Sequence, residues 1–277
     1  MAPADASSVP PDRALMQQAQ QAIASFEQST APGVWPNLNK QTIVTEMRSR
    51  LSDPFQINQG GQPFCGPASI AFELVRKHPL RYIQICRSLF ETGGFDSQSR
   101  HITASSILRQ SQGRLRMGQA DWMVLATLRE SENFIFPVDP SAPDIIRNIS
   151  GMTKSWEMKG WVREVLGYRN VKYTHTYIYG EFEALQEVAQ IIAAGGVAFA
   201  LITAEGLLSN RKPFLPYPNH WITLLGNISL QKGQPWQHDS GHVSLDVYSW
   251  ARKMHVDLDE GPFEDYFWGV VTGSPTD

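Results

Sequence analysis

A cysteine at the start of an apolar run has the clearest capacity for chemistry in this sequence. In NQGGQPFCGPASIAFELV, residues 58–75, Cys65 follows a loop of Gln, Gly and Pro and precedes apolar residues at helical spacing. A thiol at a helix N-terminus lies at the positive end of the helix dipole, which lowers its pKa and favours the thiolate. Gly66 gives the backbone room, and Pro67 suits a first-turn position that needs no N–H partner. The pattern predicts a thiolate nucleophile at Cys65.

The loop before Cys65 carries a candidate oxyanion donor. Gln59 precedes Cys65 across Gly60 and Gly61, so its amide N–H could be directed at a carbonyl bound at the sulfur. The backbone N–H of Cys65 would be the second donor to the developing oxyanion. We therefore expect an oxyanion hole at Gln59, with Gln62 as the alternative donor.

A thiolate nucleophile needs a base, and His220 is the candidate among seven histidines. It heads the apolar strand HWITLLG, where a polar side chain at the strand start can face a cleft. Taken alone, His220 fits an ordinary strand-end histidine as well as it fits a catalytic base. The presence of Cys65 as a candidate nucleophile favours the catalytic interpretation. Asp246, in VSLDVYSW, is the predicted third member that orients the imidazole, with Asp239 and Ser249 as open alternatives.

Strand alternation underlies the choice of Asp246. In VSLDVYSW it puts Asp246 on one face with Ser244, Tyr248 and Trp250, while the opposite face is mainly apolar. We expect the apolar face to lie against the core and the Asp246 face to lie toward His220.

These residues together resemble the papain-like cysteine peptidases. Asn58-Gln59-Gly60 ahead of Cys65 is similar to the Gln-Gly loop that precedes their nucleophile, and CGPAS is closer to the bacteriocin-processing peptidases of that superfamily. HWITLLG resembles their histidine strand. The triplet Tyr248-Ser249-Trp250 is similar to the Asn-Ser-Trp of papain, but Tyr248 stands where that Asn would be.

The resemblance implies an α+β fold, in which a helical N-terminal half carries the nucleophile helix and packs on a C-terminal antiparallel sheet. It implies a cysteine peptidase that hydrolyses amide bonds with Cys65, His220 and Asp246 as the catalytic triad and Gln59 in the oxyanion hole. No cofactor and no metal are expected. Acyl transfer of the deamidase or transglutaminase type uses the same triad and stays open, as does a catalytically silent papain-like binding module.

The N-terminal segment and the cysteine content bear on compartment and partners. MAPADASSVPPDR lacks the basic and apolar regions of a signal peptide, and two cysteines are too few for a disulfide framework. We expect synthesis in the cytoplasm without a signal peptide. These features resemble the bacterial effector and toxin branch, which implies delivery into a target cell by a secretion system. The partners so implied are a protein substrate and a cognate immunity or inhibitor protein or secretion-system carrier.

Composition excludes several classes of protein. Of 277 residues, 42% are apolar and 18% are charged, which supports a packed core rather than global disorder. The net charge is −3 without a run of Lys or Arg, which argues against nucleic acid or an anionic membrane as a partner. No apolar run is long enough to span a bilayer. Cys86 lies on an apolar helix face and is predicted to be a core residue, while His238 and His242 favour a solvated turn over a metal site.

The pattern along the chain changes from helical to extended. Helices are expected over 13–28, over 40–51, from Cys65 to His78 and over 81–93, with further helical segments up to about residue 170. Strands are expected in VKYTHTYIYG, VAFALIT, HWITLLGNISL, HVSLDVYSWAR and the terminal GPFEDYFWGVVTG, with a helix in EFEALQEVAQIIAAGG. We expect a tail and helix over 1–30 and one papain-like catalytic domain over 31–277, with a helical part over about 40–170 and a sheet part over about 171–273.

Overall fold

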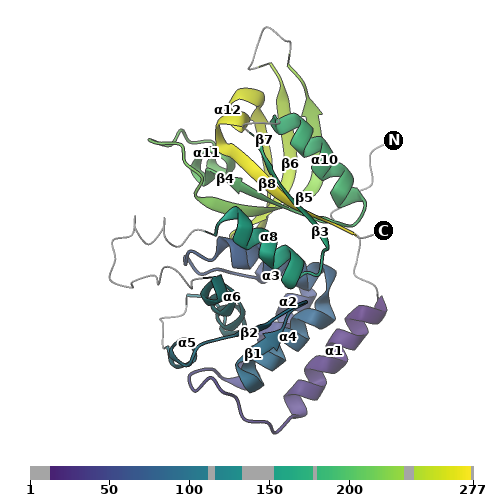
Figure 1. The fold of residues 1–277 in the computed structure, drawn as a ribbon, viewed down its shortest axis with the longest axis vertical. Coiled ribbons are helices and arrows are strands. Elements are labelled where there is room, and N and C mark those ends of the chain that lie inside the picture. The colour runs from purple at the N-terminus through teal and green to yellow at the C-terminus, as the bar shows by residue number, and fades with distance from the viewer. Residues whose placement is uncertain (1–12, 112–115, 133–152, 177–179, 234–239, 276–277) are drawn as a thin grey trace. The chain divides into compact units, whose positions relative to one another are not determined.

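The computed structural model describes residues 13–111, 116–132, 153–176, 180–233 and 240–275 (Figure 1). The chain divides into two compact units. The helical unit contains the described residues from 13 to 132 together with 164–166. The sheet unit contains residues 153–163 and the described residues from 167 onward. The mixed α+β class expected from the sequence is confirmed, and the single catalytic domain expected over 31–277 stays a prediction.

The helical unit has helices where the sequence predicts them and one short hairpin. Its elements are α1 (Arg13–Gln28), α2 (Lys40–Ser52), the 3-10 turn η2 (Pro54–Gln56), α3 (Cys65–Lys77), α4 (Pro79–Thr92), β1 (Gly94–Asp96), β2 (His101–Thr103), α5 (Ser106–Gln110) and α6 (Gln119–Glu132). The hairpin of β1 and β2 is antiparallel and was not expected.

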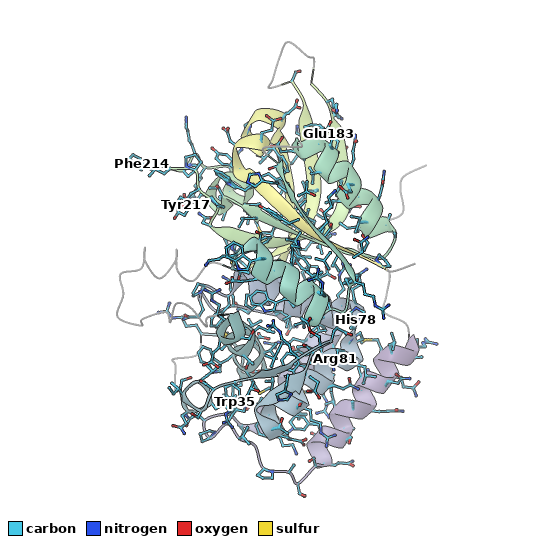
Figure 2. The ribbon with its side chains drawn as sticks, in the orientation of Figure 1. Trp35, His78, Arg81, Glu183, Phe214 and Tyr217 are labelled. Atoms are coloured by element: carbon cyan, nitrogen blue, oxygen red, sulfur yellow. The ribbon has the colours of Figure 1, made fainter. Side chains whose placement is uncertain are left out.

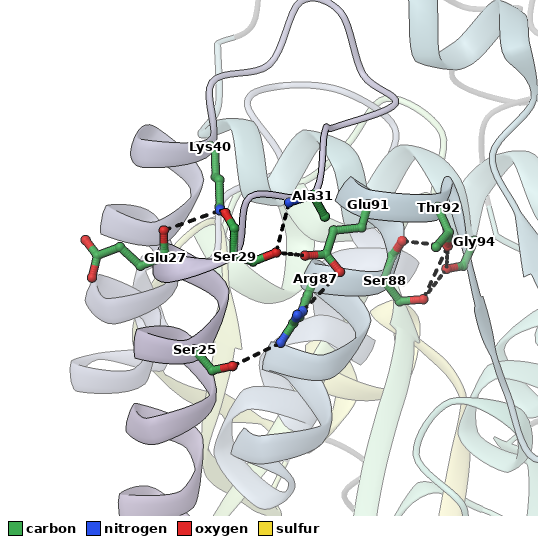
Figure 3. Close-up of polar contacts among 10 residues, drawn as sticks. All are labelled: Ser25, Glu27, Ser29, Ala31, Lys40, Arg87, Ser88, Glu91, Thr92 and Gly94. Carbon is green, nitrogen blue, oxygen red and sulfur yellow. Dashed lines mark hydrogen bonds and ion pairs between the residues drawn. The ribbon is translucent and has the colours of Figure 1, made fainter.

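The packing of α1 on α4 combines an aromatic contact with polar contacts at its rim. Phe26 and Phe90 meet edge to face with ring centroids 5.6 Å apart. Around them Ser29 donates to Glu91 at 2.9 Å and Arg87 donates to Ser25 at 3.3 Å (Figure 3). Because the rim contacts are partly exposed, each adds little to stability. The buried aromatic pair therefore contributes most to this contact.

Helix α3 is the buried helix of this unit. All residues from Cys65 to Val75 are buried, so the helix is covered on every side. It packs against α4 and α6. His78 follows as the C-cap, its backbone N–H bonded to the Leu74 carbonyl, and Pro79 begins α4 in the first-turn position that suits proline. Burial along the whole helix therefore fixes the position of Cys65 at the start of α3.

The sheet unit is built on one antiparallel sheet with strand order β3-β8-β4-β5-β6-β7 (Figure 1). The strands are β3 (Asn170–His175), β4 (Val197–Ile202), β5 (His220–Gln231), β6 (His242–Ser249), β7 (Arg252–Asp259) and β8 (Phe267–Ser274). The helices are α8 (Ser155–Glu164), α10 (Glu181–Ala193), α11 (Ala204–Ser209) and α12 (Glu260–Tyr266). In the described ranges of the chain, no helix is long and apolar enough to cross a membrane.

The core of the sheet unit lies between one face of the sheet and the helices α10, α11 and α12. Apolar side chains that alternate along the strands form the sheet side of this core, namely Ala198, Ala200 and Ile202 in β4, Ile222 and Leu224 in β5, and Val243, Leu245 and Val247 in β6. The helices contribute Leu185 and Val188 from α10, Leu207 from α11 and Phe263 from α12. The apolar face expected for β6 therefore does lie in the core.

The opposite face of the sheet is covered in part by α8. Trp221 Nε1 donates to the Thr153 carbonyl at 2.6 Å, just before that helix begins. A Cβ on Gly273 would lie 2.7 Å from Val162 Cγ1, so α8 approaches β8 closely there. All residues of β4 are buried, as expected for a strand covered on both faces.

The end of β6 differs from the expectation. The sequence predicts one strand through HVSLDVYSWAR, but β6 ends at Ser249 and the chain reverses through Trp250 and Ala251 into β7. Both turn residues have positive φ, 47° and 59°, as a two-residue type I′ hairpin requires. Such turns favour Asn-Gly, so Trp-Ala carries no turn signal, and each non-glycine residue there costs about 1–2 kcal/mol. A second difference lies near the C-terminus, where the sequence predicts a strand in GPFEDYFWGVVTG but the helix α12 precedes β8.

Candidate active site

Cys65 is the first residue of α3, as predicted. Its side chain is buried, with 5% of the residue exposed. In this described stretch, the N-cap residue Phe64 makes no side-chain capping hydrogen bond, and the first turn of α3 carries no acidic residue. The positive end of the helix dipole is therefore not offset by a carboxylate of the first turn, which favours a thiolate at this position.

The loop before Cys65 makes its own hydrogen bonds. Gly60 and Gly61 have φ of +59° and +74°, which glycine adopts without strain. The Gly60 N–H donates to Asn58 Oδ1 at 2.8 Å, and Gln59 Nε2 donates to the Gln62 carbonyl at 3.0 Å. The side-chain amide of Gln59 is thus bonded within its loop. Its role as an oxyanion donor stays a prediction.

Cys86 contrasts with Cys65. It is fully buried in α4, and the prediction that it is a core residue is confirmed. Burial raises the pKa of the Cys86 thiol to about 12, against the opposing effect of a hydrogen bond with Tyr82. Cys86 is therefore a protonated thiol at neutral pH and a poor nucleophile.

His220 begins β5 and is buried within the sheet unit. Its Nε2 lies 2.7 Å from Ser249 Oγ at the end of β6. The Trp250 ring stacks on the imidazole with centroids 4.9 Å apart and an interplanar angle of 28°. Burial lowers the pKa of His220 to about 4, so the ring is neutral at pH 7 and its protonated form is disfavoured. The tight turn at Trp250 and Ala251 brings both contacts to the ring.

Asp246 does not lie against His220, so that expectation is wrong. Asp246 pairs with Gly226 in β5. Because a strand rises by about 3.4 Å per residue, Gly226 lies about 20 Å along β5 from His220. The core residues Leu224 and Val247 are paired, which puts His220 on the core face and Asp246 on the opposite face. The alternation along β6 is as predicted, but His220 lies on the other side of the sheet from Asp246.

The Asp246 carboxylate is held by other groups. It accepts from Asn227 at 2.6 Å and lies 2.8 Å from both Lys253 Nζ and His255 Nδ1. Burial raises the pKa of Asp246, but these three hydrogen bonds outweigh burial and lower it. Of the two alternatives, Ser249 is the residue that contacts His220, and Asp239 lies outside the described residues.

No metal centre is found in the part of the chain that the structure describes, where no group of three or more His, Cys, Asp or Glu side chains could hold an ion. His242 contacts Asp257 and Asp259 across the sheet. His238, the other histidine considered for a metal, lies outside the described residues.

An exposed apolar segment, for which the sequence predicts no role, leads into His220. Phe214, Leu215 and Tyr217 are 97%, 65% and 46% exposed. Figure 2 shows Phe214 and Tyr217 on a segment that projects from the sheet unit. Its base is fixed, because Thr203 Oγ1 donates to the Tyr217 carbonyl at 2.9 Å and the Asn219 N–H donates to the Ile202 carbonyl at 2.9 Å. The run PFLPYP is the available signal, because its three prolines disfavour a helix or a central strand in a stretch that carries apolar side chains.

No protein-family model matches the sequence, and no curated protein matches it.

The buried His220 predicts a stability change with pH. Between its usual pKa of 6.5 and the folded value of about 4, the unfolded chain binds more protons than the folded protein. The free energy of unfolding therefore falls as the pH drops through this window. At about 1.4 kcal/mol per pKa unit, the total loss is about 3 kcal/mol. Urea unfolding at several pH values should show a steeper loss for the wild type than for His220→Gln. Parallel pH profiles for the two proteins would contradict this assignment.

Proposed function

We propose that this chain is a papain-like cysteine peptidase in which Cys65 is the nucleophile and His220 is the base. The observation that carries the proposal is the set of contacts on His220. The triplet that resembles papain's Asn-Ser-Trp supplies both a hydroxyl, from Ser249, and a stacked ring, from Trp250. Cys65 at the start of α3, in a first turn without an acidic residue, supports the same conclusion from the helical unit.

Ser249 replaces Asp246 as the orienting residue in this proposal. His220 Nε2 lies 2.7 Å from Ser249 Oγ. In this proposal Nε2 carries the ring proton and donates a hydrogen bond to the hydroxyl, so that Nδ1 is the nitrogen that accepts the thiol proton. The Trp250 ring stacks on the imidazole and limits its reorientation. A neutral hydroxyl stabilises an imidazolium less than a carboxylate does, so Ser249 acts mainly by fixing the ring orientation.

Ser249→Ala and Asp246→Ala separate the two candidate orienting residues. Ser249 contacts the His220 ring, so its loss should lower turnover by about tenfold and shift the limb of the pH profile that reports the imidazole. Asp246 contacts Asn227, Lys253 and His255 instead, so Asp246→Ala should keep turnover close to that of the wild type. The opposite order of effects would restore the original assignment of Asp246.

The reaction follows from these roles. The Cys65 thiolate attacks the carbonyl carbon of the substrate amide, and the backbone N–H of Cys65 with the Gln59 amide stabilises the oxyanion. His220 returns the proton to the leaving amine as the C–N bond breaks. Water then hydrolyses the thioester and releases the acid.

We propose that the substrate is a protein whose apolar side chains contact Phe214, Leu215 and Tyr217. The exposure of these three side chains supports this part of the proposal. We propose that the chain acts as a bacterial effector or toxin peptidase on a specific protein in a target cell. A cognate immunity or inhibitor protein, or a secretion-system carrier, would then be its partner.

A short bis-electrophile tests the pairing directly. Dibromoacetone alkylates a reactive thiol and then a nearby imidazole, so we expect a cross-linked peptide that joins Cys65 to His220. A cross-link from Cys65 to another histidine, or alkylation of Cys86 first, would refute the proposed pair.

Mass analysis of candidate substrate proteins treated with this protein separates two activities. A peptidase cuts the substrate chain, whereas a deamidase changes the mass of the substrate without a cut.

A further inference from the structure

We propose that the buried ion pair of Arg50 and Asp121 is a positioning device that sets the Gln59 loop in front of Cys65. The inference rests on the proposed function, because it assigns a role to the loop that would carry the oxyanion donor. It adds two positioning residues that lie far from Cys65 in the sequence.

The ion pair is bidentate and closed off from water. Arg50 Nη2 lies 2.7 Å from Asp121 Oδ2, and Arg50 Nε donates to Oδ1 at 3.2 Å. The side chains are 10% and 0% exposed. Asp121 Oδ2 also accepts the backbone N–H of Asn58 at 3.1 Å. The carboxylate thus holds the residue directly before Gln59.

The Asp121 carboxylate accepts a hydrogen bond from the Asn58 N–H, which two apolar side chains in place of Arg50 and Asp121 could not do. Buried ion pairs are often replaced by apolar residues at little cost or with a gain in stability. Stability alone therefore does not explain this pair. A carboxylate fixed by Arg50 offers a charged acceptor to a backbone N–H, which makes a stronger bond than a neutral acceptor would.

Further contacts of Asn58 and Gly60 hold the rest of the Gln59 loop in place. Asn58 Oδ1 accepts the Gly60 N–H, so Asn58 orders the backbone on both sides of Gln59. A Cβ at Gly60 would lie 2.9 Å from the backbone of Arg116, which shows how closely the loop packs there. The start of α6 is itself held to α2, because Glu46 Oε2 accepts the Ala120 N–H at 2.7 Å.

The sharpest test deletes the Asn58 N–H and leaves the ion pair intact. Ile57 has φ −58° and ψ 123°, a conformation that a following proline permits. We expect Asn58→Pro to lower kcat by about tenfold or more with little change in KM, since one oxyanion donor contributes about 10²-fold or more. Asn58→Ala keeps the N–H and is the control for the lost side chain. A loss in Asn58→Pro that is no larger than the loss in Asn58→Ala would overturn the proposal.

A second variant removes the charges. Arg50→Met with Asp121→Leu should fold, because an apolar pair replaces an ion pair, and should show faster hydrogen exchange at Asn58 and Gly60. The matched control is Glu73→Leu with Arg76→Met, which removes the ion pair of α3, whose side chains are 0% and 14% exposed. Equal exchange at Asn58 in the wild type and both double variants would refute the positioning role. Because exchange needs no substrate, this measurement decides the inference even if the proposed peptidase activity fails.

Discussion

Cys65→Ala is expected to abolish hydrolysis, with a fall in turnover of about 10⁴-fold or more, as for loss of other catalytic nucleophiles. The methyl group of alanine cannot attack a carbonyl, and no neighbouring residue of α3 carries a thiol. The fold should persist, because the change removes one sulfur atom at the helix start. Turnover against a cleaved protein substrate and the thermal midpoint are the two measurements.

Cys86 provides the matched control for Cys65. Iodoacetamide at neutral pH should label Cys65 well before Cys86, because burial raises the pKa of Cys86 to about 12. Cys86→Ala should lose stability through a small cavity and keep its turnover below the unfolding transition. Faster labelling of Cys86, or full activity in Cys65→Ala, would remove Cys65 from the role of nucleophile.

His220→Gln is expected to lower turnover by about 10³-fold or more, because glutamine can hydrogen-bond but cannot take up the thiol proton. Glutamine is chosen because its amide can still reach Ser249, which limits the structural damage. Turnover measured across acidic to alkaline pH should lose the limb that reports the imidazole. Preserved turnover in this variant would assign the base to another histidine.

Local pattern is enough to predict most of the elements. Helical spacing and the proline after His78 predict α3 with Cys65 at its start, and apolar neighbours predict that Cys86 is buried. These features depend on residues a few positions apart, and their physical causes are side-chain burial and backbone preference. The alternation within β6 also follows from the sequence, because it depends only on the period of a strand.

Contacts between distant residues were decided by the tertiary structure. The turn at Trp250 and Ala251 is held in an unfavourable conformation that their residue types do not signal, and it is this turn that brings Ser249 and Trp250 to His220. The register of β5 and β6 places Asp246 away from the ring. The bond from Asp121 to Asn58 likewise joins α6 to the loop before α3, because packing of separate helices, rather than any local spacing, sets which buried groups meet.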